Sequence, residues 1–347
     1  MWVDPFSLRL AAPLSTAAGT ITERRGFLVG VEDDGSHGLG EATPLPGWTE
    51  SSAVARRALA DATVDSPPDP DATPAAAHGV DLARLDADAR RDGRPLAAVL
   101  REHGFDTDRP LPDSVPVNAT IGDGSVDETV DAATDAAADG FAWLKLKVGV
   151  GEPERDLKRV QEVRNAVGDG VGLRLDANGA WDRPTARRMV DRLAPVGIDY
   201  LEQPLPAADL AGHAALRGRG VDIAVDESLA EAAVETVADA GAADVVVVKP
   251  MAVGGPSRAT AAAAAARAAG MEPVVTTTID GVVARTAAVH VAAAIPRVTA
   301  CGLSTGSLLA EDLAADPVVI ADGRARLPTG GGLCGDEFDS IRSARGE

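Results

Sequence analysis

Three of the four lysines in this 347-residue chain lie in or directly after apolar, strand-like runs: Lys145 and Lys147 in W-L-K-L-K-V and Lys249 in V-V-V-V-K-P. The remaining cations are 29 arginines and Lys158, which falls on an expected helix. A lysine amine can lose its proton when it is desolvated, whereas a guanidinium effectively cannot. The placement therefore predicts lysine acid–base chemistry inside a barrel or a sheet.

Three carboxylates close the apolar runs between these lysines: Asp176 in L-R-L-D-A-N, Glu202 in Y-L-E-Q-P and Asp226 in I-A-V-D-E-S. Converging carboxylates repel one another unless a cation joins them, and an all-oxygen set suits Mg²⁺, with Mn²⁺ as the alternative. A metal bound to a substrate carboxylate stabilises the enediolate that forms when a lysine removes the adjacent proton. The pattern predicts metal-assisted proton abstraction.

Each residue also has a purely structural interpretation. Asp176 or Asp226 alone would more often be a helix cap or a turn former. Lys145 and Lys147 could extend along an edge strand, and Lys249 could pair with a neighbouring carboxylate. A barrel that binds a metal only for stability is a further alternative, which a missing lysine would favour. The five strand-end positions in series favour the catalytic interpretation.

The elements that must position these residues follow a regular alternation. Between the apolar runs lie stretches of roughly a dozen residues with helical character, one of them opened by Asp182 before Arg183-Pro184. This alternation predicts a (β/α) barrel, with a doubly wound open sheet as the competing architecture. The eight apolar runs are 115–120, 143–148, 171–176, 198–202, 221–226, 245–249, 273–277 and about 299–304.

In a barrel, active sites lie at the carboxyl ends of the strands. Lys145 and Lys147 are two residues apart and so point to the same face of their strand. The second strand of an eight-stranded closure lies across from the sixth, which predicts that Lys147 and Lys249 face each other across the mouth. The three carboxylates would fill the arc between them.

The residues before the expected barrel have a different sequence pattern. The first 50 residues are typical of β-structure, residues 50–65 are expected to be helical, and 65–75 form a proline-rich connection. Two more helical segments precede Gly104. The segment 106–116, D-T-D-R-P-L-P-D-S-V-P, is the expected interdomain linker.

Composition excludes several classes of partner. A formal charge of -20, with 36 Asp and 17 Glu, disfavours nucleic acid and anionic membranes. An acidic, lysine-poor composition resembles that of proteins from salt-loving cells.

Cys301 and Cys334 are too few for a disulfide framework. The N-terminus lacks the features of a signal peptide and no apolar run is long enough to span a bilayer, which predicts a cytoplasmic protein.

The chain resembles the enolase superfamily, in the group typified by muconate lactonizing enzyme. The resemblance rests on G-L-G-E-A-T-P-L-P-G-W-T-E-S near 38–51 and on K-L-K-V, D-A-N, E-Q-P, D-E-S and K-P at the strand ends. It implies a modified (β/α)8 barrel of the (β/α)7β type at 111–324 and an α+β capping domain at 1–110, onto which 325–347 packs. It also implies that loops near 14–24 and 45–50 close over the substrate.

The same resemblance assigns roles to single residues. Asp176, Glu202 and Asp226 would bind Mg²⁺, and Lys147 and Lys249 would be the catalytic lysines. The implied supporting or substrate-facing residues are Lys145, Asn118, Asn178, Asp280 and Ser304. The partner is expected to be a small-molecule carboxylate, and the sequence is compatible with an oligomer.

Within that group, the chain most resembles the o-succinylbenzoate synthases of menaquinone biosynthesis. The P-L-P-G-W-T-E-S loop, the T-T-T-I-D-G-V-V-A-R run and G-L-S-T-G on the last strand carry this likeness. It implies dehydration of 2-succinyl-6-hydroxy-2,4-cyclohexadiene-1-carboxylate, with Lys147 moving the proton and Lys249 staying charged. Thr276–Asp280 departs from relatives, which often have Ser and Glu there, and this weakens any assignment of substrate.

The alternative reaction is an isomerisation by an N-succinylamino acid racemase, a dipeptide epimerase or a muconate-type cycloisomerase. In a racemase or an epimerase, both lysines would act as bases on opposite faces of the substrate. Against a dipeptide epimerase, the last strand lacks the acidic pair with which such enzymes hold a substrate ammonium, since the segment 301–309 contains no acidic residue.

Overall fold

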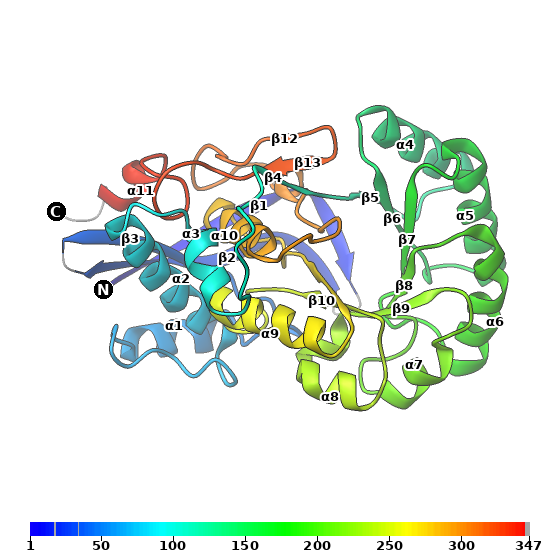
Figure 1. The fold of residues 1–347 in the computed structure, drawn as a ribbon, viewed down its shortest axis with the longest axis horizontal. Coiled ribbons are helices and arrows are strands. Elements are labelled where there is room, and N and C mark those ends of the chain that lie inside the picture. Colours follow the sequence, from blue (N-terminus) through cyan, green and yellow to red (C-terminus); the bar gives the residue numbers. More distant parts are fainter. Residues whose placement is uncertain (17–18, 34, 344–347) are drawn as a thin grey trace.

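Seven parallel strands form a curled sheet in the second part of the chain (Figure 1). The computed structural model describes residues 1–16, 19–33 and 35–343. Each strand pairs with the next one in the sequence, which is the order of a barrel and excludes the reversed order of a doubly wound sheet. The barrel prediction is therefore confirmed. The strands are β5 (Ala119–Ile121), β6 (Trp143–Lys147), β7 (Gly172–Asp176), β8 (Tyr200–Glu202), β9 (Asp222–Val225), β10 (Val245–Val248) and β11 (Glu272–Val275).

Two isolated bridges close this sheet into a barrel. Cys301 bridges to Val117 beside β5, and Gly302 bridges to Thr276 beside β11. The expected last strand at 299–304 is thus reduced to bridging residues. The expected first strand at 115–120 is also interrupted, because β4 (Ser114–Pro116) pairs with the C-terminal strand β13 (Arg324–Arg326).

Helices cover the outside of the curled sheet (Figure 1). Asp182 caps one of them as predicted, since its carboxylate accepts a hydrogen bond from the amide of Thr185 at 2.9 Å. Among the described residues, no helix has both the length and the apolar character needed to cross a membrane. The helices are α4 (Val126–Ala138), α5 (Pro153–Val167), α6 (Arg183–Leu193), α7 (Leu210–Leu216), α8 (Val234–Asp239), α9 (Pro256–Ala268) and α10 (Val282–Ala294), with short 3-10 turns η1 (Ala194–Val196), η2 (Glu227–Ala230) and η3 (Gly306–Leu308).

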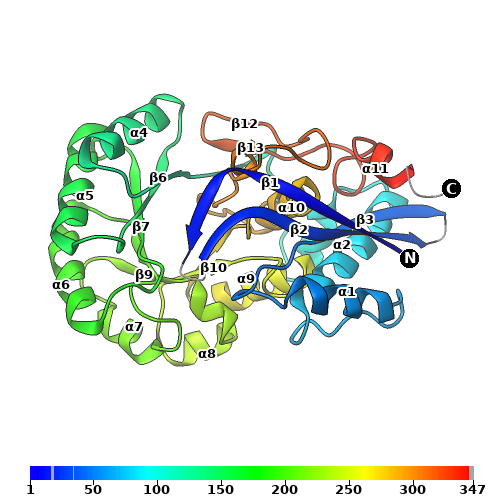
Figure 2. The same ribbon diagram turned by 180° about the vertical axis from the view of Figure 1, so that it is seen from behind.

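A separate antiparallel sheet precedes the barrel, and Figure 2 shows its two long strands running together toward the barrel. The strands are β1 (Trp2–Thr16), β2 (Gly19–Asp33) and β3 (Ser36–Ala42), and the helices α1 (Ser52–Asp61), α2 (Pro74–Arg91) and α3 (Leu96–Glu102) follow. Helix α2 packs on β2 and β3. The expected β-structure, the helix near 50–65 and the irregular connection after it are confirmed.

The C-terminal residues return to this N-terminal unit. The buried carboxylate of Asp86 accepts hydrogen bonds from the amides of Leu39 at 2.9 Å and Leu333 at 2.8 Å, and from the guanidinium of Arg342 at 2.7 Å. The remaining C-terminal elements are β12 (Ile320–Ala321) and α11 (Asp339–Ser343). The domain boundaries at 110 and 325 stay a prediction.

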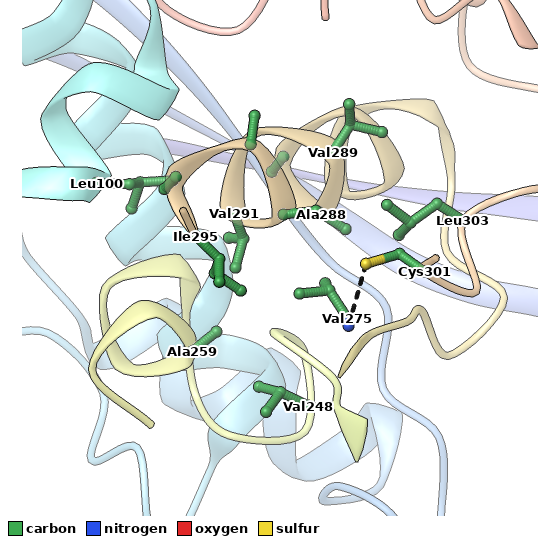
Figure 3. Packing of buried hydrophobic residues seen from close by; sticks show 14 of the residues in the cluster. Leu100, Val248, Ala259, Val275, Ala288, Val289, Val291, Ile295, Cys301 and Leu303 are labelled. Atoms are coloured by element: carbon green, nitrogen blue, oxygen red, sulfur yellow. Dashed lines mark hydrogen bonds between the residues drawn. The ribbon is translucent and has the colours of Figure 1, made fainter. Parts of the chain in front are cut away.

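The hydrophobic core has two main parts. One lies among β5 to β9 and helices α4 to α7, and the other joins β10, β11, α9 and α10 to α2, α3 and the C-terminal residues. Figure 3 shows the second part, where Leu100 of α3 lies near Ile295 after α10. Cys301 and Cys334 are buried free thiols.

Candidate active site

Five adjacent barrel strands carry ionisable side chains at or just beyond their carboxyl ends. β6 ends at Lys147, β7 at Asp176 and β8 at Glu202, and these three are ladder partners in register. Asp226 and Lys249 directly follow β9 and β10. Partners in register on parallel strands point to the same face. The predicted strand-end arrangement is therefore present in the fold.

The lysines and the carboxylates form a network of two contact groups, one around Asp176 and Glu202 and the other around Asp226. The ammonium of Lys145 lies 3.0 and 3.2 Å from the two carboxylate oxygens of Glu202 and 3.2 Å from Asp176. Lys147 donates to Asp176 at 2.7 Å. Lys249 donates to both oxygens of Asp226. Each of the three carboxylates thus has a lysine partner.

Burial and neighbouring charges shift the pKa values of the three carboxylates in different directions. Burial raises the pKa of Glu202 to about 7, with the negative charge of Asp176 adding to the rise and Lys145 opposing it. Burial also raises the pKa of Asp226 to about 6, against the positive charge of Lys249. For Asp176, burial is outweighed by Lys145 and Lys147, which hold its pKa below the usual range.

Lys145 is held as a cation. Burial alone would lower its pKa, but the charges of Glu202 and Asp176 outweigh burial and raise this pKa well above the usual value. A lysine that keeps its proton is a poor base. Of the two lysines on β6, Lys147 is therefore the better candidate for proton transfer, and Lys145 the supporting residue that the resemblance implied.

The donor set has the chemistry that Mg²⁺ prefers, because it consists of buried carboxylate oxygens on neighbouring strands. Within the described ranges, no group of three or more His, Cys, Asp or Glu side chains is arranged to hold a metal ion. Lys145 contacts both Asp176 and Glu202, while Lys249 contacts Asp226. The assignment of these carboxylates as metal ligands stays a prediction.

Asn178 is the predicted supporting residue that the structure brings to Lys147. Its side-chain oxygen accepts a hydrogen bond from Lys147 at 2.8 Å, and its side-chain nitrogen donates to Glu227 at 3.0 Å. The backbone of Asn178 is left-handed, with φ of 44°, a conformation that asparagine tolerates. Glu227 therefore fixes which end of the amide faces the lysine. Sequence reasoning quoted Glu227 in D-E-S but gave it no role.

Gln203 is a second residue that sequence reasoning missed. Its side-chain oxygen accepts hydrogen bonds from the amides of Asp226 at 2.9 Å and Ser228 at 3.2 Å, and its side-chain nitrogen donates to the carbonyl of Leu205 at 2.9 Å. Gln203 thus holds the turn that carries Asp226. The E-Q-P motif was the available signal, because a fully buried polar side chain beside a strand end needs partners.

Trp48 is the third missed residue. Its ring centroid lies 3.5 Å from the ammonium nitrogen of Lys249, which is cation–π distance. The turn that carries it is fixed by hydrogen bonds from the amides of Trp48 and Thr49 to the carbonyl of Leu45, both at 2.9 Å. The segment 45–50 was expected to approach the substrate, and the structure places its tryptophan on a predicted catalytic lysine.

The other predicted residues have no hydrogen bond to this network in the part of the chain that the structure describes. Asn118 is buried, and its backbone amide donates to the backbone carbonyl of Cys301 at 3.0 Å. Ser304 is half-buried after the closing bridge. Asp280 is buried and accepts a hydrogen bond from the amide of Thr278 at 3.2 Å. Their roles toward a substrate stay predictions.

The expected loop at 14–24 is mostly strand. Residues 14–16 pair with 19–21 at the tip of the β1–β2 hairpin, and residues 17 and 18 lie outside the described part of the chain. Leu10 bridges to Leu309, so this hairpin lies against the segment that follows the last barrel bridge. The hairpin reaches this segment because β1 and β2 continue to pair beyond the part of the sheet that α2 covers.

Comparisons with known proteins agree with this architecture. A family model described as "Mandelate racemase / muconate lactonizing enzyme, N-terminal domain" matches residues 3–100, and one described as "Enolase C-terminal domain-like" matches residues 128–339. The chain is 39% identical over 218 residues to o-succinylbenzoate synthase of Thermobifida fusca (strain YX), a match that covers 62% of this chain and 67% of that protein.

Relatives with other activities are similar to a comparable degree. Muconate cycloisomerase 1 of Rhodococcus opacus is 36% identical over 197 residues, covering 55% of this chain and 52% of the relative, about half its length. The crystal structure of a dipeptide epimerase from Enterococcus faecalis V583, complexed with Mg and the dipeptide L-Leu-L-Tyr, matches with a TM-score of 0.84 at 27% identity, covering 96% of this chain and 97% of that one. The comparisons therefore establish family and fold, while these relatives differ in reaction.

Proposed function

Because the chain belongs to the enolase superfamily, we propose that it is a Mg²⁺-dependent enzyme that removes the proton next to a substrate carboxylate. The observation that carries the proposal is the order of charged side chains along five adjacent strand ends, with Lys147 and Lys249 at its two ends. Mg²⁺ held by Asp176, Glu202 and Asp226 would neutralise the charge that develops on the substrate carboxylate.

Lys147 is the proposed base. It is about one-third exposed, whereas Lys145 and Lys249 are largely buried, so Lys147 is the most accessible of the three lysines. Its ammonium is oriented by Asp176 and Asn178. In its neutral form, an amine held at this position can take a proton from the substrate and return it to a leaving group on the same face.

Lys249 is proposed to act as a fixed positive charge. It lies between the carboxylate of Asp226 and the ring of Trp48, two partners that both favour a cation. A cation on the face opposite the base stabilises negative charge in the transition state without moving a proton. This arrangement supports a reaction that needs only one base.

The reaction that we propose is dehydration of 2-succinyl-6-hydroxy-2,4-cyclohexadiene-1-carboxylate to o-succinylbenzoate. Lys147 takes the ring proton next to the carboxylate, the carbon–oxygen bond to the hydroxyl breaks, and the proton returns to that oxygen so that water leaves. The product ring is aromatic, which supplies driving force. The similarity to the Thermobifida fusca enzyme supports this choice.

Isomerisation is the competing reaction, because the same two lysines could act as bases on opposite faces. The similarity to muconate cycloisomerase 1 and to a dipeptide epimerase is the reason to test isomerisation as well. The segment 301–309 contains no acidic residue to hold a substrate ammonium, which disfavours the dipeptide epimerase.

The deciding experiment assays dehydration of the cyclohexadiene substrate with Mg²⁺ in high salt, beside racemisation of N-succinylamino acids. High salt is used because the formal charge of -20 needs screening. Dehydration that depends on Mg²⁺ and greatly exceeds racemisation supports the proposal. Racemisation without dehydration would replace the lyase by the isomerase.

A further inference from the structure

Arg24 joins three segments of the chain through backbone carbonyls. Its side chain donates to the carbonyl of Ile279 at 3.1 Å, to that of Pro44 at 3.2 Å and to that of Thr43 at 2.9 Å. Arg24 itself lies on β2 and is 3% exposed. One buried guanidinium thus connects the β1–β2 hairpin, the start of the Trp48 turn and the segment after β11.

A buried arginine is a costly way to add stability. Burial lowers the pKa of Arg24, although the charges of Asp280 and Glu41 oppose that effect. Apolar residues of similar size often stabilise a protein as well as a buried charge does. What an arginine adds is a rigid fork of donors that fixes several acceptors at once. Because the three partners of Arg24 are all backbone carbonyls, we infer that its main contribution is to fix the position of the backbone.

The Ile279 carbonyl belongs to a strained residue. Ile279 has a φ of 63°, a left-handed conformation that is a genuine outlier for a β-branched side chain. Such conformations cost free energy and persist where the surroundings hold them. Arg24 holds the carbonyl of Ile279. The residue that follows, Asp280, accepts hydrogen bonds from the amide and hydroxyl of the residue that precedes it, Thr278.

Both segments that Arg24 holds lead to Lys249. The amide of Thr276 donates to the carbonyl of Val248 at 3.0 Å, so the segment 276–280 begins beside the strand that carries Lys249. The other segment runs from Pro44 into the turn whose Trp48 ring lies on the Lys249 ammonium. We propose that Arg24 is a positioning residue that holds these two segments in place beside Lys249. As a statement about catalysis, this rests on the function proposed above.

The first test does not depend on turnover. Hydrogen–deuterium exchange of the protein alone is compared between wild type and R24M, which keeps an unbranched side chain and removes the donors. Amides in 43–49 and 276–281 should exchange roughly tenfold faster in R24M, because hydrogen bonds from a charged donor are lost. R24K, which keeps the charge but cannot reach three carbonyls at once, should lie between the two.

Arg101 offers a matched control. It is 8% exposed and donates to the carbonyls of Ala294, Arg109 and Ala293 at 3.0, 2.6 and 2.8 Å, away from Lys249. R101M should lower the resistance to urea while leaving exchange in 43–49 and 276–281 at its wild-type rate. If R24M unfolds, R24K supplies the comparison. Unchanged exchange in both segments of a folded Arg24 variant, or equal acceleration by R101M, would overturn the proposal.

The second test uses the substrate. R24K should raise KM by more than it lowers kcat, because Arg24 places the segments beside the substrate and contacts no reacting group. If wild type turns over none of the assayed substrates, the proposed function fails, yet faster exchange at the two segments would still establish Arg24 as the residue that positions them. Turnover with unaltered KM and unaltered exchange in R24K would contradict the positioning role alone.

Discussion

Strands β6 to β8 and strands β10 and β11 contribute to the same mouth, yet they pack against different parts of the chain. The buried hydrophobic residues around β6, β7 and β8 come from the barrel itself, because most of them lie between 121 and 223 and Tyr200 of β8 packs with Val245 and Val274 of β10 and β11. The core around β10 and β11 also includes Leu39 of β3 and Leu100 of α3. The side of the site that holds Lys147 is therefore built by the barrel alone, whereas the side that holds Lys249 depends on the N-terminal unit.

The polar contacts follow the same division. Lys147 is oriented by Asp176, which ends the next strand along the chain, and by Asn178 just after it. Lys249 has one such neighbour, Asp226, and one from the N-terminal unit, Trp48. Variation in the N-terminal unit can thus reshape the mouth beside Lys249 while the proposed base keeps its surroundings. Relatives of this chain do differ in reaction.

The largest effect is expected on the barrel-built side. K147A should lower kcat by about 10²–10⁴-fold, the usual contribution of a positioned general base. Titration calorimetry should show Mg²⁺ binding that is largely retained. K158A is the control, since Lys158 is an exposed lysine on α5. Full activity in K147A would remove Lys147 from the mechanism.

A pair of core substitutions tests whether the two sides depend on different units. L39A and L173A each remove a fully buried leucine side chain, and each should lower the free energy of unfolding by about 2–5 kcal/mol in urea titrations. L39A loosens β3 against the core that it shares with β10 and β11 and should also raise KM. L173A lies in the other core and should leave KM near its wild-type value. Equal changes in KM would show that the two sides are not separable.

Much of the barrel-built side can be predicted from the sequence, because it depends on local patterns. An apolar run that ends in a charged residue predicts a strand end, and the alternation of side chains puts Lys145 and Lys147 on one face. The ladder pairs Lys147 with Asp176 in register, as those rules require. Residues on consecutive strands become neighbours without any knowledge of how distant segments dock.

The other side could not be predicted in the same way. The contacts of Trp48 with Lys249 and of Arg24 with Ile279 join residues about 200 or more positions apart, and they arise only when the N-terminal unit docks on the barrel. The interrupted first strand has a similar cause, because β4 pairs with the distant β13. Periodicity carries no information about such pairings.

Lys249 provides the third test, because its role separates the two reactions. K249R keeps a positive charge that cannot be removed, so dehydration should fall by roughly tenfold, whereas racemisation, which needs a neutral lysine, should be lost. K249M, which removes the charge, should lose both activities. Initial rates for the two substrates, measured on the same preparations, give the comparison. Dehydration lost as completely in K249R as in K249M would indicate that Lys249 moves a proton.

The smallest effect is expected at Glu41, which ties β3 to the start of α10. Its carboxylate accepts hydrogen bonds from the amides of Gly281 at 2.7 Å and Ala284 at 2.9 Å. Burial and then the negative charge of Asp280 raise the pKa of Glu41 from 4.5 to about 7, while the nearby Arg24 guanidinium supplies positive charge.

A pKa raised by folding stabilises the folded state fully below pH 4.5, and this contribution is lost as the pH rises through about 7. The free energy of unfolding of wild type should therefore fall between pH 5 and pH 8 by on the order of 1 kcal/mol more than that of E41Q, whose amide does not titrate. Urea titrations at the two pH values measure the difference. E23Q is the control, because Glu23 is an exposed carboxylate on β2 that pairs with Arg25. Parallel pH profiles for wild type and E41Q would show that Glu41 stays ionised in the interface, and that the junction between the N-terminal unit and the barrel is insensitive to pH in this range.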